Sequence, residues 1–147
     1  MVVTTREPII ARSVSFFWYR RVYIGTKFAR LPKGQQTAVI LHERGHIEKH
    51  HTEARLLSVL FPFKPFIRWL CHRQEYAADR YVLEHGFGRE LVDFLVANGA
   101  RESFTHPSDY ARACRLQKML YDARTSTDDR KSSNHVDEQS DTTARSA

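Results

Sequence analysis

The chain has 147 residues, of which 41% are hydrophobic and 12% aromatic, a composition that fits one small globular domain with a modest core. Two cysteines are too few for a disulfide framework, no window approaches the ~20 apolar residues of a membrane-spanning helix, and Met1 to Ala11 lack the apolar run of a signal peptide, so we expect a cytoplasmic protein. The formal net charge is +6, and it is +8 for the residues before the acidic stretch that begins at Thr125. A basic face of this kind can contact nucleic acid, anionic lipid or an acidic substrate, although solvated surface is its commoner role.

The N-terminal part is predicted to form a small sheet. Residues 1–12 are an arm or a first short strand, with Pro8 interrupting any regular element. From Ser13 to Leu31 the chain is rich in β-branched and aromatic residues, and Gly25 divides it, which favours two or three short strands. We therefore expect a small antiparallel sheet.

A long helix is predicted next. The Pro-Lys-Gly sequence at 32–34 ends the strand pattern, and from Gln35 onward Gly45 is the only breaker before Pro62. Apolar residues recur at helical spacings along this run, so the segment at 41–46, Leu-His-Glu-Arg-Gly-His, is expected to lie within the helix.

This segment has the spacing of a metal site. In a helix, a step of four residues advances ~6 Å with only ~40° of rotation, so His42 and His46 can bind one ion. Imidazole nitrogen suits zinc, and a catalytic zinc site needs a third protein ligand and an open position for water. Glu43 is then placed to take a proton from that water. The same pattern also arises by chance in ordinary solvated helices. A third ligand elsewhere in the chain is therefore needed to support a metal site.

Residues 56–70 form an apolar stretch that Pro62 and Pro65 divide into a helix end, a turn and a helix start. An exposed hairpin of this composition, with Arg68 and Trp69, can rest on a membrane surface or receive a partner, and burial in the core is the alternative.

A second helix is expected from Phe66 to His85, with Gly86 at its C-terminal end. Its inward stripe carries two carboxylates, those of Glu75 and Asp79. Because a buried carboxylate is costly unless it is paired or bound to metal, both residues are candidates for a site.

Two further helices are predicted, at 88–98 with Gly99 as its cap and at 109–124 after a turn at 105–108. From Thr125 hydrophobic residues nearly vanish. We therefore divide the chain into a domain at 1–124 and a disordered polar tail at 125–147.

Three segments occur together in this sequence: Ala38–Ile47 (AVILHERGHI), Arg73–Asp79 (RQEYAAD) and Thr105–Arg112 (THPSDYAR). In kind and order they resemble the motifs of the HtpX and CAAX prenyl endopeptidase family of zinc metallopeptidases, within the gluzincins, and the likeness spans roughly Val22 to Leu120. The familiar members carry membrane-spanning helices, so the resemblance is to a minimal soluble or peripheral version. It implies a zincin-like α+β domain, in which a short antiparallel sheet packs on the active-site helix and three further helices complete the fold.

The resemblance also implies roles for the remaining residues. Glu75 matches the family's third zinc ligand, and Asp79 matches an aspartate outside the ligand set. His106 would face the oxyanion formed during hydrolysis, and Arg112 would support the same pocket or bind substrate. A donor aimed at such a charge commonly lowers the barrier by ~2.7 to 4 kcal/mol.

Physical chemistry is consistent with these roles. Two imidazoles and one carboxylate leave a zinc-bound water acidic, and an aspartate can fix the tautomer of a ligand histidine.

Alternative roles remain for several of these residues. His50 continues the histidine spacing but is rotated about 80° from His42, which fits a tetrahedral site poorly. Asp79 can instead pair with Arg80 or Arg73, and the turn at 105–108 can be a helix cap that leaves Arg112 solvated.

The expected function is zinc-dependent endopeptidase hydrolysis, with one Zn²⁺ and a peptide or protein as substrate. An extended substrate would pair with a sheet edge, which we expect at Phe16 to Ile24. The alternative function is a non-catalytic zincin-like module that contacts another protein through its basic face. Nucleic acid is a less expected partner for that face. Peripheral membrane contact through residues 56–70 is compatible with either.

Overall fold

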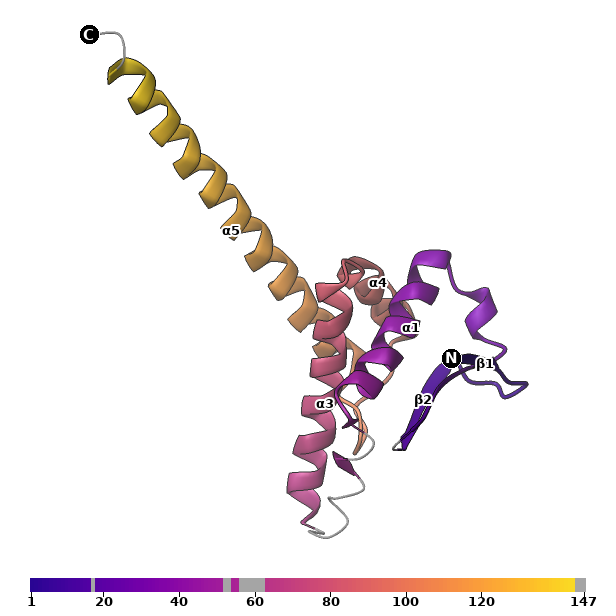
Figure 1. Ribbon diagram of the computed structural model, residues 1–147. Coiled ribbons are helices and arrows are strands. Elements are labelled where there is room, and N and C mark those ends of the chain that lie inside the picture. The colour runs from indigo at the N-terminus through magenta and orange to yellow at the C-terminus, as the bar shows by residue number, and fades with distance from the viewer. Residues whose placement is uncertain (17, 52–53, 56–62, 145–147) are drawn as a thin grey trace.

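The computed structural model describes residues 1–16, 18–51, 54–55 and 63–144, with side chains as far as Ser126 apart from that of Phe16. These residues form a small α+β domain, as predicted (Figure 1). The elements in chain order are β1 (Val2–Thr4), β2 (Ala11–Phe16), β3 (Tyr19–Ile24), a short 3-10 helix η1 (Phe28–Arg30), α1 (Lys33–Glu48), α3 (Lys64–Glu84), α4 (Gly88–Asn98) and α5 (Asp109–Ala144).

The sheet has the strand order β1-β3-β2. Strands β2 and β3 form the predicted antiparallel hairpin, with Ala11 opposite Ile24 and Phe16 opposite Tyr19. The expectation of a wholly antiparallel sheet is wrong for β1, which runs parallel to β3. Residues 5–10 reverse the chain and place β2 on the other side of β3, so β1 and β3 point the same way.

Helix α1 lies between the sheet and helix α3 (Figure 1), packing on β2 with one side and on α3 with the other. The contact with α3 is very close at Gly45, where an added Cβ atom would lie 3.1 Å from Cα of Ala78 and 3.2 Å from Cβ of Tyr81. Because Gly45 has no side chain, the backbones of α1 and α3 can lie close enough for short side chains on the two helices to meet. A Cβ atom at this position would require Ala78 or Tyr81 to shift by a few tenths of an ångström.

Helix α1 is shorter than predicted. It ends at Glu48, whereas the absence of breakers indicated a helix running toward Pro62. His50 adopts a left-handed conformation with φ of 53°, which is uncommon for a residue other than glycine. His51 thereby turns back toward the helix that precedes it.

The next two helices match the predictions closely. Helix α3 begins two residues earlier than expected and ends at Glu84, followed by Gly86 with φ of 83°. Helix α4 has the predicted bounds and ends on left-handed Gly99. Side chains from α1, α3, α4 and α5 pack together as one core: Ala38, Leu41, Val82, Leu91, Val92, Leu95, Ala113 and Leu116.

Helix α5 begins at Asp109 as predicted but continues to Ala144, past the expected end at Arg124. Figure 1 shows its C-terminal half projecting away from the other elements. The stretch from Asp109 to Ala147 contains neither glycine nor proline, so nothing in its backbone chemistry stops a helix. The predicted domain boundary at Thr125 is therefore not marked by a helix end, and the disordered tail stays a prediction.

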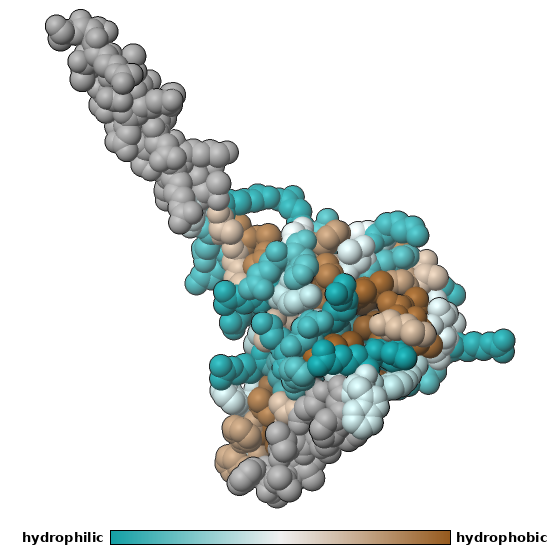
Figure 2. All heavy atoms as spheres, in the orientation of Figure 1, coloured by the Kyte–Doolittle hydropathy of each residue, from teal (hydrophilic) through white to brown (hydrophobic). Residues whose placement is uncertain are grey.

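The beginning of α3 exposes aromatic side chains. Residues 56–62 of the predicted apolar hairpin lie outside the described residues, but Phe63, Phe66 and Trp69 are 67%, 43% and 51% exposed. Figure 2 shows hydrophobic side chains at the lower end of the molecule, where α3 begins in Figure 1. Among the described helices, none is long and apolar enough to cross a membrane.

Candidate metal centre

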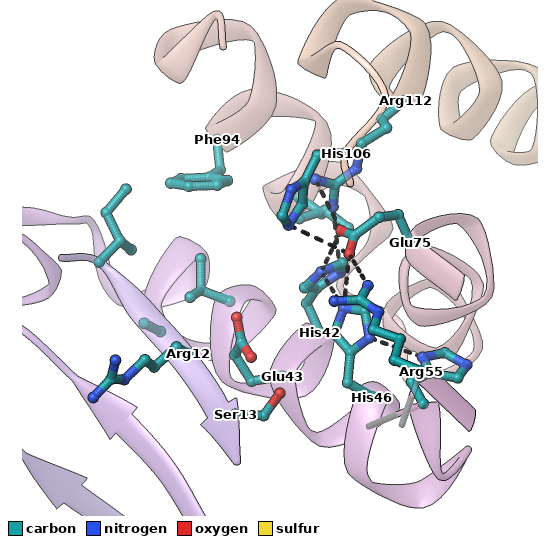
Figure 3. Close-up of a pocket in the computed structure, with 15 residues that line it drawn as sticks. Arg12, Ser13, His42, Glu43, His46, Arg55, Glu75, Phe94, His106 and Arg112 are labelled. Atoms are coloured by element: carbon teal, nitrogen blue, oxygen red, sulfur yellow. Dashed lines mark hydrogen bonds and ion pairs between the residues drawn. The ribbon is translucent and has the colours of Figure 1, made fainter. Parts of the chain in front are cut away.

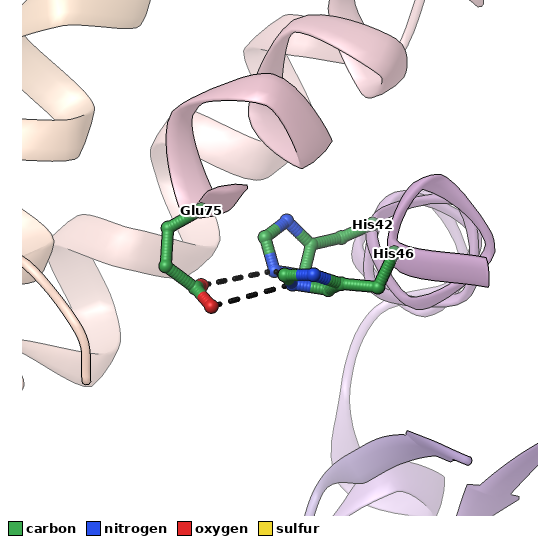
Figure 4. Close-up of side chains that lie close together, drawn as sticks. All are labelled: His42, His46 and Glu75. Atoms are coloured by element: carbon green, nitrogen blue, oxygen red, sulfur yellow. Dashed lines mark hydrogen bonds and ion pairs between the residues drawn. The ribbon is translucent and has the colours of Figure 1, made fainter. Parts of the chain in front are cut away.

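Three ligand-type side chains meet between helices α1 and α3 (Figure 4). Nε2 of His42 and Nε2 of His46 lie 3.1 Å apart, and each faces one carboxylate oxygen of Glu75 at 3.3 Å. All three residues are buried, and His42, His46 and Glu75 form a cluster that can hold a metal ion. The close approach at Gly45 produces this meeting, because the histidines flank Gly45 on α1 and Glu75 lies one turn before Ala78 on α3.

The spacing of these atoms fits a metal ion. Ligand atoms at ~2.0 to 2.1 Å from a tetrahedral zinc ion are ~3.3 Å from one another, close to the distances found here. Two neutral imidazoles and a carboxylate are also the kind of donor set that zinc uses in catalytic sites. Without a positive charge between them, lone pairs from two imidazoles and a carboxylate would repel each other. The cluster therefore favours a cation, either a metal ion or a bound proton.

The second ring nitrogen of His42 faces Asp79. Nδ1 of His42 lies 3.0 Å from Oδ1 of Asp79, so an N–H there donates to the carboxylate and leaves Nε2 free as a ligand. Burial and Arg112 lower the pKa of His42, but the hydrogen bonds to Asp79 and Glu75 outweigh them and raise it to about 9. A proton and a metal ion therefore compete for the lone pair of His42 Nε2. The carboxylates of Asp79 and Glu75 favour the binding of either one.

Arg112 pairs with Asp79 inside the domain. Its Nε donates to Oδ2 of Asp79 at 2.9 Å and its Nη2 donates to Oδ1 at 2.5 Å, a bidentate pair that is buried. The alternative of a solvated Arg112 is therefore wrong. Asp79 pairs with Arg112 rather than with Arg80, which bonds Glu84 instead. Burial raises the pKa of Asp79, but the hydrogen bond from Arg112 and that from His42 lower it overall.

Arg112 also extends toward the candidate ligands, with Nη1 3.6 Å from Oε2 of Glu75. Burial opposes the charge of Glu75, yet its contacts with His42 and His46 hold the pKa of that carboxyl well below its usual range. Glu75 is therefore ionised at neutral pH, as a metal ligand must be.

His106 lies at the rim of this cluster. Its Nε2 is 3.5 Å from Oε1 of Glu75, its Nδ1 bonds Oγ1 of Thr105 at 2.8 Å, and its side chain is 53% exposed. Burial is the main cause that lowers its pKa. Figure 3 shows His106 beside Arg112 above the carboxylate of Glu75, so the Thr105–Arg112 segment does reach the site.

A cavity of about 430 Å³ opens in front of the cluster. One wall is helix α1 with Glu43, which Figure 3 shows between the histidines and strand β2, near Ser13. Apolar side chains form another wall: Val39, Leu91 and Phe94. The predicted ligands and the predicted base therefore line one cavity.

The strand that borders the cavity is not the predicted one. Residues 16–24 were expected to offer a free edge, but β3 lies in the middle of the sheet and is paired on both sides. The edge strand next to the cavity is β2, whose residues Ala11, Arg12 and Ser13 line it. The predicted edge is thus wrong by one strand, because strand order depends on pairing between distant segments.

Two further residues of the site, His51 and Arg55, are not among the candidates that the sequence indicates. His51 is 7% exposed, and its Nδ1 lies 2.8 Å from Nδ1 of His46. Arg55 donates to Oε1 of Glu75 at 3.2 Å. His50, the rival ligand, is exposed and belongs to neither the metal cluster nor the cavity lining. A histidine five residues after His46 was visible in the sequence, but its inward position depends on the turn at His50.

Searches of protein-family models, curated proteins and solved structures returned no match to this chain.

Proposed function

We propose that this protein is a zinc-dependent metalloendopeptidase. The observation that supports it is the convergence of His42, His46 and Glu75 at a cavity that Glu43 also lines. A structural zinc site is closed by four protein ligands, whereas a catalytic site keeps one position open. Three candidate ligands beside an open cavity match the catalytic arrangement.

In this proposal His42, His46 and Glu75 hold the ion. When bound, zinc would polarise the peptide carbonyl and make a water molecule acidic near neutral pH. Glu43 accepts the proton of that water and passes it to the leaving amine, which is the work of a general base and then a general acid. Asp79 keeps the proton of His42 on Nδ1, away from the metal position.

His106 and Arg112 take different parts. His106 is half exposed at the rim, where a ring N–H can donate to the oxyanion of the tetrahedral intermediate. Arg112 is buried and bonded twice to Asp79, so its role is to hold Asp79 and the charge of Glu75 in place. We therefore assign catalysis to His106 and positioning to Arg112.

The walls of the cavity suggest how a peptide binds. An extended chain can add to the free edge of β2 at residues 11–13 by main-chain hydrogen bonds. An apolar side chain then fits against Val39, Leu91 and Phe94. Unfolded segments, which offer free main-chain groups and exposed apolar residues, are the expected substrates.

Metal removal tests the proposal. Zinc-loaded protein should cleave a labelled unfolded casein, whereas treatment with 1,10-phenanthroline should abolish cleavage and added Zn²⁺ should restore it. Metal content is measured by mass spectrometry beside peptide release. One bound zinc with no hydrolysis of any unfolded substrate, together with salt-sensitive binding to protein or nucleic acid, would favour the rival binding module.

The exposed aromatic residues support a second proposal, that the enzyme contacts membrane surfaces. Aromatic and basic side chains together suit the interface of an anionic bilayer, and Arg73 already stacks on Trp69 at 5.2 Å from the ring centroid. Wild-type protein should float with phosphatidylserine liposomes, and Trp69→Ser should reduce the bound fraction several-fold. Trp18→Ser, which changes a 91% exposed tryptophan in the hairpin, is the control. Equal flotation of wild type and Trp69→Ser would contradict the proposal.

A further inference from the structure

The two candidate ligand histidines are supported from different sides. Nδ1 of His42 faces the carboxylate of Asp79, which can only accept a hydrogen bond. Nδ1 of His46 faces another imidazole, that of His51, at 2.8 Å. The rings of His46 and His51 meet edge to face, with centroids 4.9 Å apart. The chemistry that orients His46 is therefore distinct from that which orients His42.

A contact between two Nδ1 atoms holds one proton. If His51 supplies it, neutral His46 must carry its own proton on Nε2, where it points at Nε2 of His42 and at Glu75 and excludes a metal ion. If His46 supplies it, Nε2 of His46 has a free lone pair directed at the same position. Only the second arrangement is compatible with metal binding, and in it His51 is the acceptor.

The position of His51 is itself held from helix α3. Nε2 of Gln74, a buried side chain, donates to the main-chain carbonyl of His51 at 3.2 Å. Oε1 of Gln74 accepts a hydrogen bond from Nε of Arg55 at 2.6 Å, and the same guanidinium bonds Glu75. Gln74 and Glu75 are adjacent on α3. Glu75 is a candidate metal ligand, and Gln74 holds His51, which contacts the candidate ligand His46.

We propose that His51 is a positioning residue of the metal centre, which accepts a hydrogen bond from Nδ1 of His46 and thereby directs the lone pair of His46 Nε2 at the ion. The inference rests on the proposed function, because it presumes that His46 binds metal. It adds a residue outside the segment at 41–46. This residue, His51, directly follows the left-handed His50 and contacts His46.

Two substitutions separate the hydrogen bond from simple packing. His51→Phe keeps the ring but removes the acceptor, and it should weaken zinc binding by about 10 to 100-fold, the usual cost of losing a partner of a ligand histidine. His51→Asn retains an oxygen near the position of Nδ1 and should restore affinity to within a few-fold of wild type. His85→Phe, at the far end of α3, should leave affinity unchanged. Zinc affinity is measured by competition with a chromophoric chelator.

The tautomer can be read directly by ¹⁵N-resolved NMR of the histidine rings in the zinc-loaded full chain. We expect the proton of His46 on Nδ1 and that of His51 on Nε2. A proton on Nδ1 of His51, or a folded His51→Phe variant with wild-type zinc affinity, would overturn the inference while leaving the proposed peptidase intact. A wild-type protein that binds no zinc would instead overturn both. The NMR measurement needs no variant, so it decides the matter even if His51→Phe fails to fold.

Discussion

Replacing Glu43 with glutamine should lower the rate of peptide cleavage by about 10² to 10⁴-fold, the usual contribution of a general base, while zinc content stays at the wild-type level. Glutamine has the shape of glutamate but cannot accept the proton of the attacking water. Glu43 lines the cavity without belonging to the metal cluster, so its loss should leave the ligands in place. Cleavage of labelled casein and metal analysis of the same preparation provide the two measurements.

Glu48→Gln is the matched control, because Glu48 is an exposed glutamate in the last turn of the same helix. It should cleave at the wild-type rate. Undiminished activity of Glu43→Gln would exclude the mechanism proposed here even if zinc is bound. A parallel loss of zinc and activity in Glu43→Gln would show instead that this residue supports the ligands.

Much of this site could be predicted because local rules determine it. Helical periodicity places His42 and His46 on one face, and it shows that Glu75 and Asp79 interrupt an otherwise apolar stripe. A carboxylate on a buried stripe must have a partner, and the structure provides the histidines for Glu75 and Arg112 for Asp79.

The parts that could not be predicted depend on contacts between distant segments. The strand that borders the cavity follows from the pairing order of three strands, whereas composition indicates only where strands occur. The inward turn of His51 follows from the end of α1 at Glu48 and from the hydrogen bond of Gln74, 23 residues further along the chain. The end of α5 could not be predicted either, and the helix continues beyond Arg124. A polar segment without glycine or proline has no local signal for where a helix ends.

Removing the carboxylate of Glu75 should weaken zinc binding by more than about 100-fold, because the loss of a ligand costs more than the loss of a partner outside the ligand set. Glu75→Ala deletes one of three protein donors and also leaves the charges of Arg55 and Arg112 near the ion without their common partner. Both effects oppose a cation. After dialysis against a weak chelator, wild-type protein should retain one zinc per chain and Glu75→Ala almost none.

The control is Glu84→Ala, which removes an exposed glutamate paired with Arg80 at the end of the same helix and should retain zinc fully. Glu75→Gln adds a second distinction, because it preserves the shape and one oxygen but not the charge. Intermediate affinity in Glu75→Gln would show that an oxygen donor and the negative charge both contribute. Full zinc occupancy in Glu75→Ala would mean that the third ligand is another residue. A further His50→Ala change in that background would then test the histidine that continues the helical spacing, which the exposed position of His50 argues against.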